Sequence, residues 1–182
     1  TVTDRQNKID SVADIIETDL HFIGATGVED RLQNGVPETV DTLMKANIKV
    51  WMLTGDRFET AVSTGFLCNM LQPSMIQLHL LKKSRESIVK SIDNFTDLID
   101  KSLFGTTFAL VLNGAAVESI LSDSFLKSPD SRKFIQVVKK CRTLLCCRLS
   151  PLQKSQIVRF AREHLDWITL AVGDGGNDVS MI

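Results

Sequence analysis

The stretch that decides the fold is VGDGGNDVSMI, residues 172–182. It follows an apolar run at residues 168–172 that reads as a buried strand, and its glycines permit a tight turn with close backbone approach. Residues 177–182 are predicted to open a helix. Asp174 and Asp178 are four residues apart and are expected to face one pocket. Because Mg²⁺ takes oxygen ligands, few of them from the protein, this carboxylate pair predicts a metal site beside phosphate.

The length and charge of the chain fit a single globular domain and argue against a nucleic-acid-binding or membrane-spanning protein. The chain has 182 residues, the size of one ordinary domain, and can bury roughly 70 % of the surface of its unfolded form. Twenty-one Lys and Arg residues against 22 Asp and Glu give a net charge of −1, so no global field favours nucleic acid or an anionic membrane. The apolar runs are far shorter than the ~20 residues that span a bilayer, and we expect a soluble piece of protein.

The cysteines show no CxxC spacing, which argues against a metal or redox site. We predict that they are reduced thiols of the core. They are Cys68, Cys141, Cys146 and Cys147.

Strand-like and helix-like patterns alternate along the chain. The expected strands are residues 20–25, 48–53, 76–81, 107–112, 143–148 and 168–172. The expected helices are residues 9–16, 37–46, 58–70, 88–99, 115–121, 134–138 and 151–164, and the Ser, Asp and Pro cluster at 122–131 reads as a surface loop. This alternation predicts an α/β fold with a mostly parallel sheet, helices on both faces, and ligands beyond the carboxyl ends of the strands.

One of these strand ends carries Thr54, Gly55 and Asp56, directly after the strand at 48–53 and before a helix. A hydroxyl group and exposed amides at a helix N-terminus form a cradle for phosphate. Taken alone, this tripeptide is equally well read as an ordinary loop.

A second strand end carries Arg148 and, beyond a Ser150 capping box, Lys154. The helix dipole disfavours a cation in the first turn by roughly 0.3–1 kcal/mol, a conflict that an anion beside Lys154 removes. A single lysine is usually solvated, but the three strand ends together favour a phosphoryl-transfer site. No GxxxxGK[ST] stretch occurs, so a P-loop NTPase is unsupported.

Three segments of the sequence resemble the motifs of a known protein family. MLTGDRFETA at 52–61, CCRLSPLQK at 146–154 and VGDGGNDVSMI at 172–182 resemble the second, third and fourth motifs of the haloacid dehalogenase superfamily as found in P-type ATPases. GATGVEDRLQNGVPETV at 24–40 and NDVSMI at 177–182 resemble the phospholipid flippase branch, whereas cation pumps typically read NDAPAL at the last position. The resemblance implies a haloacid dehalogenase-like, Rossmannoid three-layer sandwich.

The DKTGT sequence that supplies the family's aspartate nucleophile does not occur in the chain. The resemblance therefore implies the part of the phosphorylation domain downstream of that motif, at residues 20–182. Residues 1–19 are expected to be the tail of the nucleotide-binding domain or a linker helix. The absent strand is expected between the strands that end at Thr54 and Val172. The parent protein is then an ATP-hydrolysing phospholipid translocase, and this piece alone is expected to be inactive.

The resemblance also implies roles for individual residues. The expected catalytic residues are Thr54, Lys154, Asp174 and Asp178, of which Thr54 and Lys154 bind the transferring phosphoryl group. Phosphate and nucleotide contacts are expected from Thr54, Gly55, Asp56, Arg148, Lys154 and Asn177, and metal contacts from Asp174 and Asp178. Asp30 matches an acidic position near the nucleotide path.

Mg²⁺ is the implied cofactor and ATP the implied substrate. The implied partners are a phospholipid, reached through a membrane domain absent from the chain, and the rest of the same polypeptide. An accessory subunit is a further possible partner, and no nucleic-acid partner is expected. The parent would lie on the cytosolic face of a membrane. Alternatives are a piece of a cation-transporting P-type ATPase, a soluble haloacid dehalogenase-like phosphatase, or a non-catalytic domain of the same fold.

Overall fold

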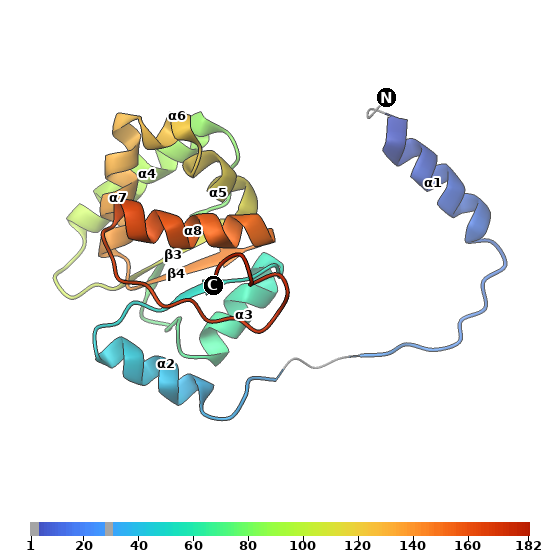
Figure 1. Cartoon of the computed structure of the whole chain (residues 1–182), viewed down its shortest axis with the longest axis horizontal. Coiled ribbons are helices and arrows are strands. Elements are labelled where there is room, and N and C mark those ends of the chain that lie inside the picture. Colours follow the sequence, from blue (N-terminus) through green and yellow to red (C-terminus); the bar gives the residue numbers. More distant parts are fainter. Residues whose placement is uncertain (1–3, 28–30) are drawn as a thin grey trace. The chain divides into compact units, whose positions relative to one another are not determined.

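The computed structural model describes residues 4–27 and 31–182 and divides the chain into two units, at residues 1–31 and 32–182. The first unit contains helix α1 (Arg5–Ile16) and an irregular segment after it (Figure 1). The strand predicted at 20–25 is wrong, since Phe22 and Ile23 there are exposed by 88% and 100%. A strand requires a hydrogen-bonded neighbour, and the described part of this unit offers none.

The second unit is built around a sheet of four parallel strands in the order β1-β4-β3-β2. The strands are β1 (Trp51–Leu53), β2 (Ile76–Leu80), β3 (Phe108–Asn113) and β4 (Thr143–Cys147). The helices are α2 (Val36–Lys45), α3 (Phe58–Leu67), α4 (Arg85–Lys101), α5 (Gly114–Ile120), α6 (Asp123–Leu126), α7 (Pro129–Lys140) and α8 (Pro151–His164).

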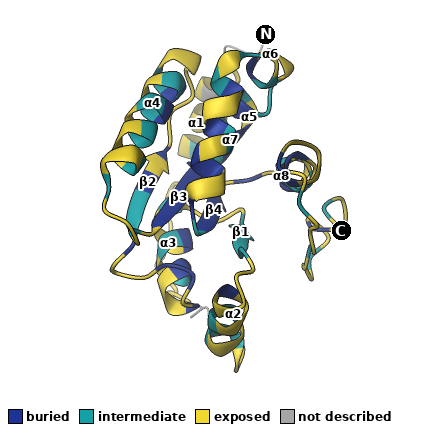
Figure 2. Cartoon of the chain, turned by 90° about the vertical axis from the view of Figure 1, so that its left-hand side faces the viewer, coloured by how far each residue is buried: buried dark blue, intermediate teal, exposed yellow. Residues whose placement is uncertain are grey.

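Alternate residues of the central strands face two separate cores, because successive side chains of a strand point to opposite faces. Leu110 and Leu144 face the larger core, which α4, α5, α7 and α8 cover. Val111 and Leu145 face a smaller core with residues of α2 and α3. Figure 2 shows the buried strands β3 and β4 between these helices. The fold is therefore the predicted haloacid dehalogenase-like three-layer sandwich, with an all-parallel sheet.

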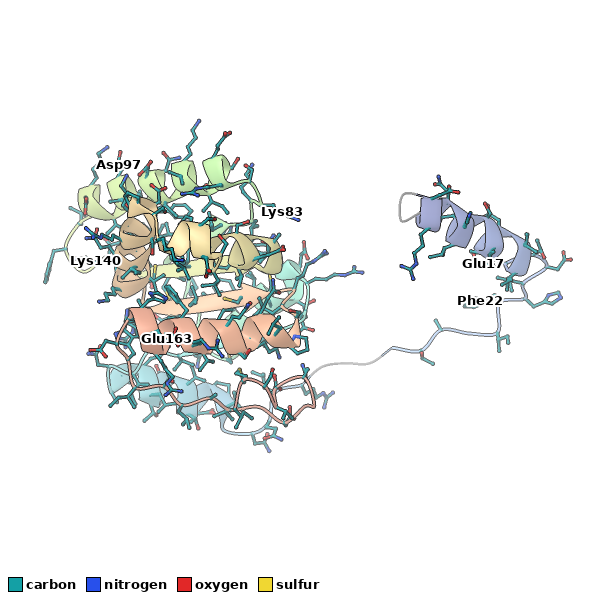
Figure 3. The ribbon with its side chains drawn as sticks, turned by 45° about the horizontal axis from the view of Figure 1, so that its top comes forward. Glu17, Phe22, Lys83, Asp97, Lys140 and Glu163 are labelled. Carbon is teal, nitrogen blue, oxygen red and sulfur yellow. The ribbon has the colours of Figure 1, made fainter. Side chains whose placement is uncertain are left out.

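Charged side chains lie on the outer surfaces of the helices, as Figure 3 shows for Asp97 of α4, Lys140 of α7 and Glu163 of α8. The four cysteines are free and buried, as predicted for core thiols. Burial raises the pKa of the Cys141 thiol to about 12, so this group stays protonated at neutral pH.

The loop predicted at residues 122–131 is wrong, because it contains α6 and the start of α7. Ser122 caps α6, accepting from the amide of Phe125, and Pro129 occupies the first turn of α7. The Ser and Pro residues that indicated a loop are helix-starting residues. Phe125 is buried and packs edge-on against Phe134, with ring centroids 6.3 Å apart.

Two cations close the ends of helices at the amino edge of the sheet. Lys49 Nζ donates to the carbonyl oxygens of Lys139, at 2.7 Å, and Cys141, at the C-terminal end of α7. Arg142 donates in turn to the carbonyl oxygen of Met44, in the last turn of α2. These side-chain donors bond carbonyls at the two helix ends, where the helices run out of their own amides, and the Met44 carbonyl also accepts from the Asn47 amide at 3.0 Å.

The chain after α8 differs from the prediction. Residues 168–172 are irregular, and residues 177–182 form turns rather than a helix. Ile168, Leu170 and Val172 are exposed by 106%, 89% and 80%. These residues have the period of a strand, but no described strand lies beside them to complete a ladder. Strand β1, shorter than predicted, stands at the edge of the sheet with β4 as its only neighbour among the described strands.

Candidate functional site

The turn after β1 is closed by its own side chains. The amide of Thr54 donates to the carbonyl oxygen of Cys146 at 2.9 Å, which extends the β1–β4 ladder by one residue. The Thr54 hydroxyl donates to Asp56 Oδ2 at 2.7 Å and accepts from the Asp56 amide at 3.1 Å. Thr54 is half-buried and Asp56 is exposed, so the turn presents a hydroxyl, backbone amides and a carboxylate at the carboxyl edge.

The turn after β4 is joined to this first turn through the backbone. The amide of Arg148 donates to the carbonyl oxygen of Asp56 at 2.8 Å, and the amide of Leu149 donates to the carbonyl oxygen of Thr54 at 3.0 Å. Arg148 adopts a φ of +52°, in the left-handed region. The structure thus brings the turn of Thr54 and Asp56 together with Arg148, which lies far from that turn in the sequence.

Helix α8 begins with the predicted capping box. Ser150 Oγ accepts from the amide of Gln153 at 3.3 Å, and Gln153 Oε1 accepts from the amide of Ser150 at 3.0 Å. Pro151 occupies the first helical position, where its missing N–H costs nothing. The cap sets the direction in which the chain leaves β4 and puts Lys154 in the first turn, where its side chain is buried.

Lys154 Nζ donates to Asp178 Oδ1 at 2.7 Å, and the two side chains are exposed by only 7% and 11%. The anion beside this first-turn lysine is therefore a carboxylate of the chain itself. The hydrogen bond from Lys154 holds the pKa of Asp178 below its ordinary value, against a smaller opposing effect of burial. The Gly175 amide, 3.4 Å from Asp178 Oδ2, acts in the same direction.

Two glycines of the terminal turn, Gly173 and Gly175, are required by space, whereas a Cβ atom at Gly176 would meet nothing. A Cβ atom at Gly173 would lie 2.4 Å from Asp178 Cβ, and one at Gly175 would lie 2.2 Å from Asn177 Oδ1. Any side chain at either position would push these polar groups out of place. Asp174 and Asn177 are exposed, whereas Asp178 is buried, so the two carboxylates of the turn lie in different surroundings.

This donor set fits a magnesium ion that takes most of its ligands from phosphate and water. Asp174 has an exposed carboxylate, whereas Asp178 is engaged by Lys154 through one oxygen and by Gly175 through the other. Within residues 4–27 and 31–182 no group of three or more His, Cys, Asp or Glu side chains forms a metal cluster. Asp30 lies outside the described residues.

Three contacts that hold the terminal segment could not be read from the sequence. Trp167 packs edge-on against Trp51 of β1, with centroids 5.8 Å apart, and Lys49 Nζ lies 5.3 Å from the Trp167 ring centroid. At the other end, Ser180 Oγ donates to the Pro151 carbonyl oxygen at 3.2 Å. The segment is therefore held at both ends, while residues 168–172 between them are exposed. Neither serine nor tryptophan carries a local signal of such long-range contacts.

Several known proteins that are similar to this chain are phospholipid-transporting ATPases. The chain is 39% identical over 98% of its length to phospholipid-transporting ATPase DNF1 of Chaetomium thermophilum, and 38% identical over its whole length to phospholipid-transporting ATPase DRS2 of Saccharomyces cerevisiae. It is 43% identical over 92% of its length to phospholipid-transporting ATPase VD of Macaca fascicularis. No protein-family profile matches the chain.

The chain spans only 13% of the length of the first two relatives and 25% of the third. In the described part of the chain, none of the helices has both the length and the apolar character that crossing a membrane requires. The three similarities nevertheless cover between 92% and 100% of the chain. The chain therefore belongs to the phospholipid-transporting branch of the P-type ATPases, as a piece of such a protein.

Proposed function

We propose that this chain supplies the phosphate-binding and magnesium-binding groups of the phosphorylation domain in a phospholipid-transporting ATPase. The observation that carries the proposal is the buried pair of Lys154 and Asp178 at the start of α8, which follows directly on the Arg148 turn that is bonded to the Thr54 turn. It places a cation, a hydroxyl group and carboxylates at one edge of a parallel sheet, where ligands of such folds bind.

The chemistry we propose is electrostatic. The Thr54 hydroxyl and the amides of Gly55 and Asp56 donate to phosphoryl oxygens, and Lys154 stabilises the negative charge that develops on them. Asp178 holds the Lys154 ammonium in place before the phosphoryl group arrives. Asp174 is the carboxylate ligand of Mg²⁺, with Asn177 and Asp178 in support. Bound there, Mg²⁺ would neutralise charge on the phosphoryl oxygens.

The covalent step requires a carboxylate from elsewhere in the polypeptide. In the proposed reaction an aspartate of a DKTGT segment attacks the γ-phosphorus of ATP, ADP departs, and water later hydrolyses the aspartyl phosphate. Asp56 and Arg148 face the nucleotide. The parent would couple this cycle to movement of a phospholipid, with the present domain on the cytosolic face of the membrane.

A titration of the isolated chain with inorganic phosphate and Mg²⁺ tests the proposal. Amide NMR signals of Gly55, Asp56 and Gly175 should shift with weak, saturable affinity. Lys154→Met should remove the phosphate-dependent shifts, because the cation is lost. Lys133→Met is the control, since Lys133 also forms an ion pair, with Asp93 at 2.6 Å, but on the outer surface. Equal phosphate affinity in the Lys154→Met chain and the unaltered chain would overturn the proposal.

A further inference from the structure

Gln153, the neighbour of Lys154, is hydrogen-bonded at both ends of its side-chain amide. Its Oε1 accepts from the amide of Ser150 at 3.0 Å, within the first turn of α8. Its Nε2 donates to the carbonyl oxygen of Gly114 at 2.8 Å, which lies 39 residues earlier in the chain. The side chain thus joins the start of α8 to the start of α5, directly after β3.

The second of these bonds is not needed for the cap. A capping box uses only the side-chain oxygen of the third helical residue, and glutamate serves it as well as glutamine. The Nε2 group has no function in the box, and its partner belongs to another element. Gln153 therefore does more than start its own helix.

The surface against which Gln153 rests is tightly packed. A Cβ atom at Gly114 would lie 2.4 Å from the Arg148 carbonyl oxygen and 3.0 Å from Gln153 Oε1, so only glycine fits. The preceding residue, Asn113, donates to the carbonyl oxygen of Leu81 at 3.1 Å and accepts from the amide of Ala116 at 2.9 Å. The chain around Gly114 is thereby hydrogen-bonded to the end of β2 and to α5. It offers a backbone of fixed position against which the start of α8 can bind.

We infer that Gln153 is a positioning residue for Lys154, bracing the first turn of α8 against the Gly114 backbone so that the neighbouring ammonium group meets Asp178. The inference rests on the proposed function of Lys154 in phosphate binding. Core contacts of α8 begin at Ile157, almost one turn beyond Lys154, and continue at Phe160 and Ala161. They hold the body of the helix, whereas the Gln153 bond acts on the turn that carries the lysine.

Two variants of this chain separate the effect of the Gln153–Gly114 hydrogen bond from the effect of the capping box. Gln153→Glu keeps an oxygen for the capping box but removes the Nε2 donor. Gly114→Ala crowds the same contact from the other side and adds no charge. Gly65→Ala in α3 is the control, because its Cβ would lie 3.0 Å from side-chain carbons of Leu145 and Leu71, away from α8. If Gly114→Ala does not fold, the uncharged Gln153→Met takes its place, compared with Ser150→Ala, which weakens the cap but keeps the Nε2 donor.

Two measurements report the placement of Lys154. A buried, ion-paired ammonium group exchanges its protons slowly and gives an Nζ signal in the NMR spectrum of the labelled chain, and acetylation read by mass spectrometry gives the reactivity of each lysine. We expect Gln153→Glu and Gly114→Ala to lose the Lys154 Nζ signal and to acetylate Lys154 severalfold faster. Gly65→Ala should keep the signal and the slow rate, even where its urea midpoint falls equally.

Each other outcome overturns the inference. Unchanged signals in both variants would show that core packing alone places the lysine. A change in Gln153→Glu only would be an effect of the new charge, and an equal change in Gly65→Ala would be a general loosening. Neither measurement needs phosphate. Failure of the proposed function would instead appear as unchanged phosphate binding by Lys154→Met.

Discussion

Lys154 and Asp178 form a buried ion pair, with Nζ and Oδ1 2.7 Å apart, that joins the first turn of α8 to the terminal turn. Ser180 makes a second bond to the same helical turn, through the Pro151 carbonyl oxygen. The carboxylate offsets the unfavourable position of a cation at a helix N-terminus. The terminal turn is therefore held in place by the residue that we propose to bind phosphate.

The pair predicts an acid-dependent loss of stability. Because the folded-state pKa of Asp178 lies below its ordinary value of about 3.9, the pair stabilises the fold above that pH. This contribution should disappear as the pH falls from about 4 through the lowered pKa. In urea midpoints measured from pH 6 downward, Asp178→Asn should be lower than the unaltered chain at pH 6, and the difference should close in acid. A constant difference across that range would contradict the role of the pair.

Lys154 should be required for catalysis in a longer polypeptide that contains both this chain and a DKTGT segment. Loss of a preorganised donor to developing charge typically costs about a hundred- to a thousandfold in rate. Lys154→Ala should therefore slow phosphoenzyme formation by that factor, measured with labelled ATP, while Lys133→Ala leaves it unchanged. Phosphorylation of the Lys154→Ala protein at the normal rate would exclude this role.

The chain alone should form no acyl phosphate. Asp178 is engaged by Lys154, and Asp174 is proposed as a metal ligand rather than a nucleophile. After incubation with labelled ATP and Mg²⁺, acid precipitation should recover no hydroxylamine-sensitive label. Stoichiometric labelling of Asp174 or Asp178 would refute the assignment of both as supports for metal and phosphate.

Lys49 should stabilise the fold through the C-terminal end of α7. Lys49→Met leaves the carbonyl oxygens of Lys139 and Cys141 without this donor, which should cost about 1–3 kcal/mol of unfolding free energy. Lys45→Met is the matched control, because Lys45 forms an exposed pair with Asp41 worth only about 0.3–0.5 kcal/mol. Equal urea midpoints for the two variants would contradict the importance of these bonds.

The free edge of β1 and the exposed apolar residues of 168–172 should make the isolated chain associate. Unpaired strand edges recruit strands of other chains, and a charge beside them opposes this. Light scattering should show a mass that rises with concentration, and Leu170→Lys should reduce the rise. Leu152→Lys, on the exposed side of α8, should not. A monomeric mass at every concentration would contradict this expectation.

Local sequence signals correctly predicted those helices and strands that are determined by residues close together in the sequence. The Ser150 capping box is complete within four residues, and the structure contains it as predicted. The apolar runs of β2, β3 and β4 identified the strands that are paired on a buried sheet. Short-range rules failed where one residue type has two uses, as at Ser122 and Pro129, which begin helices rather than a loop.

By itself, the sequence determined the α/β class, the three motifs and the family to which the chain belongs. Only the tertiary structure decided which groups meet. It pairs Lys154 with Asp178, joins Gln153 to Gly114, and leaves residues 168–172 without a ladder partner among the described strands. The physical reason is the distance along the sequence over which each interaction acts. Caps and periodicity act within a few residues, whereas an ion pair or a strand pairing depends on which distant segment the fold brings alongside.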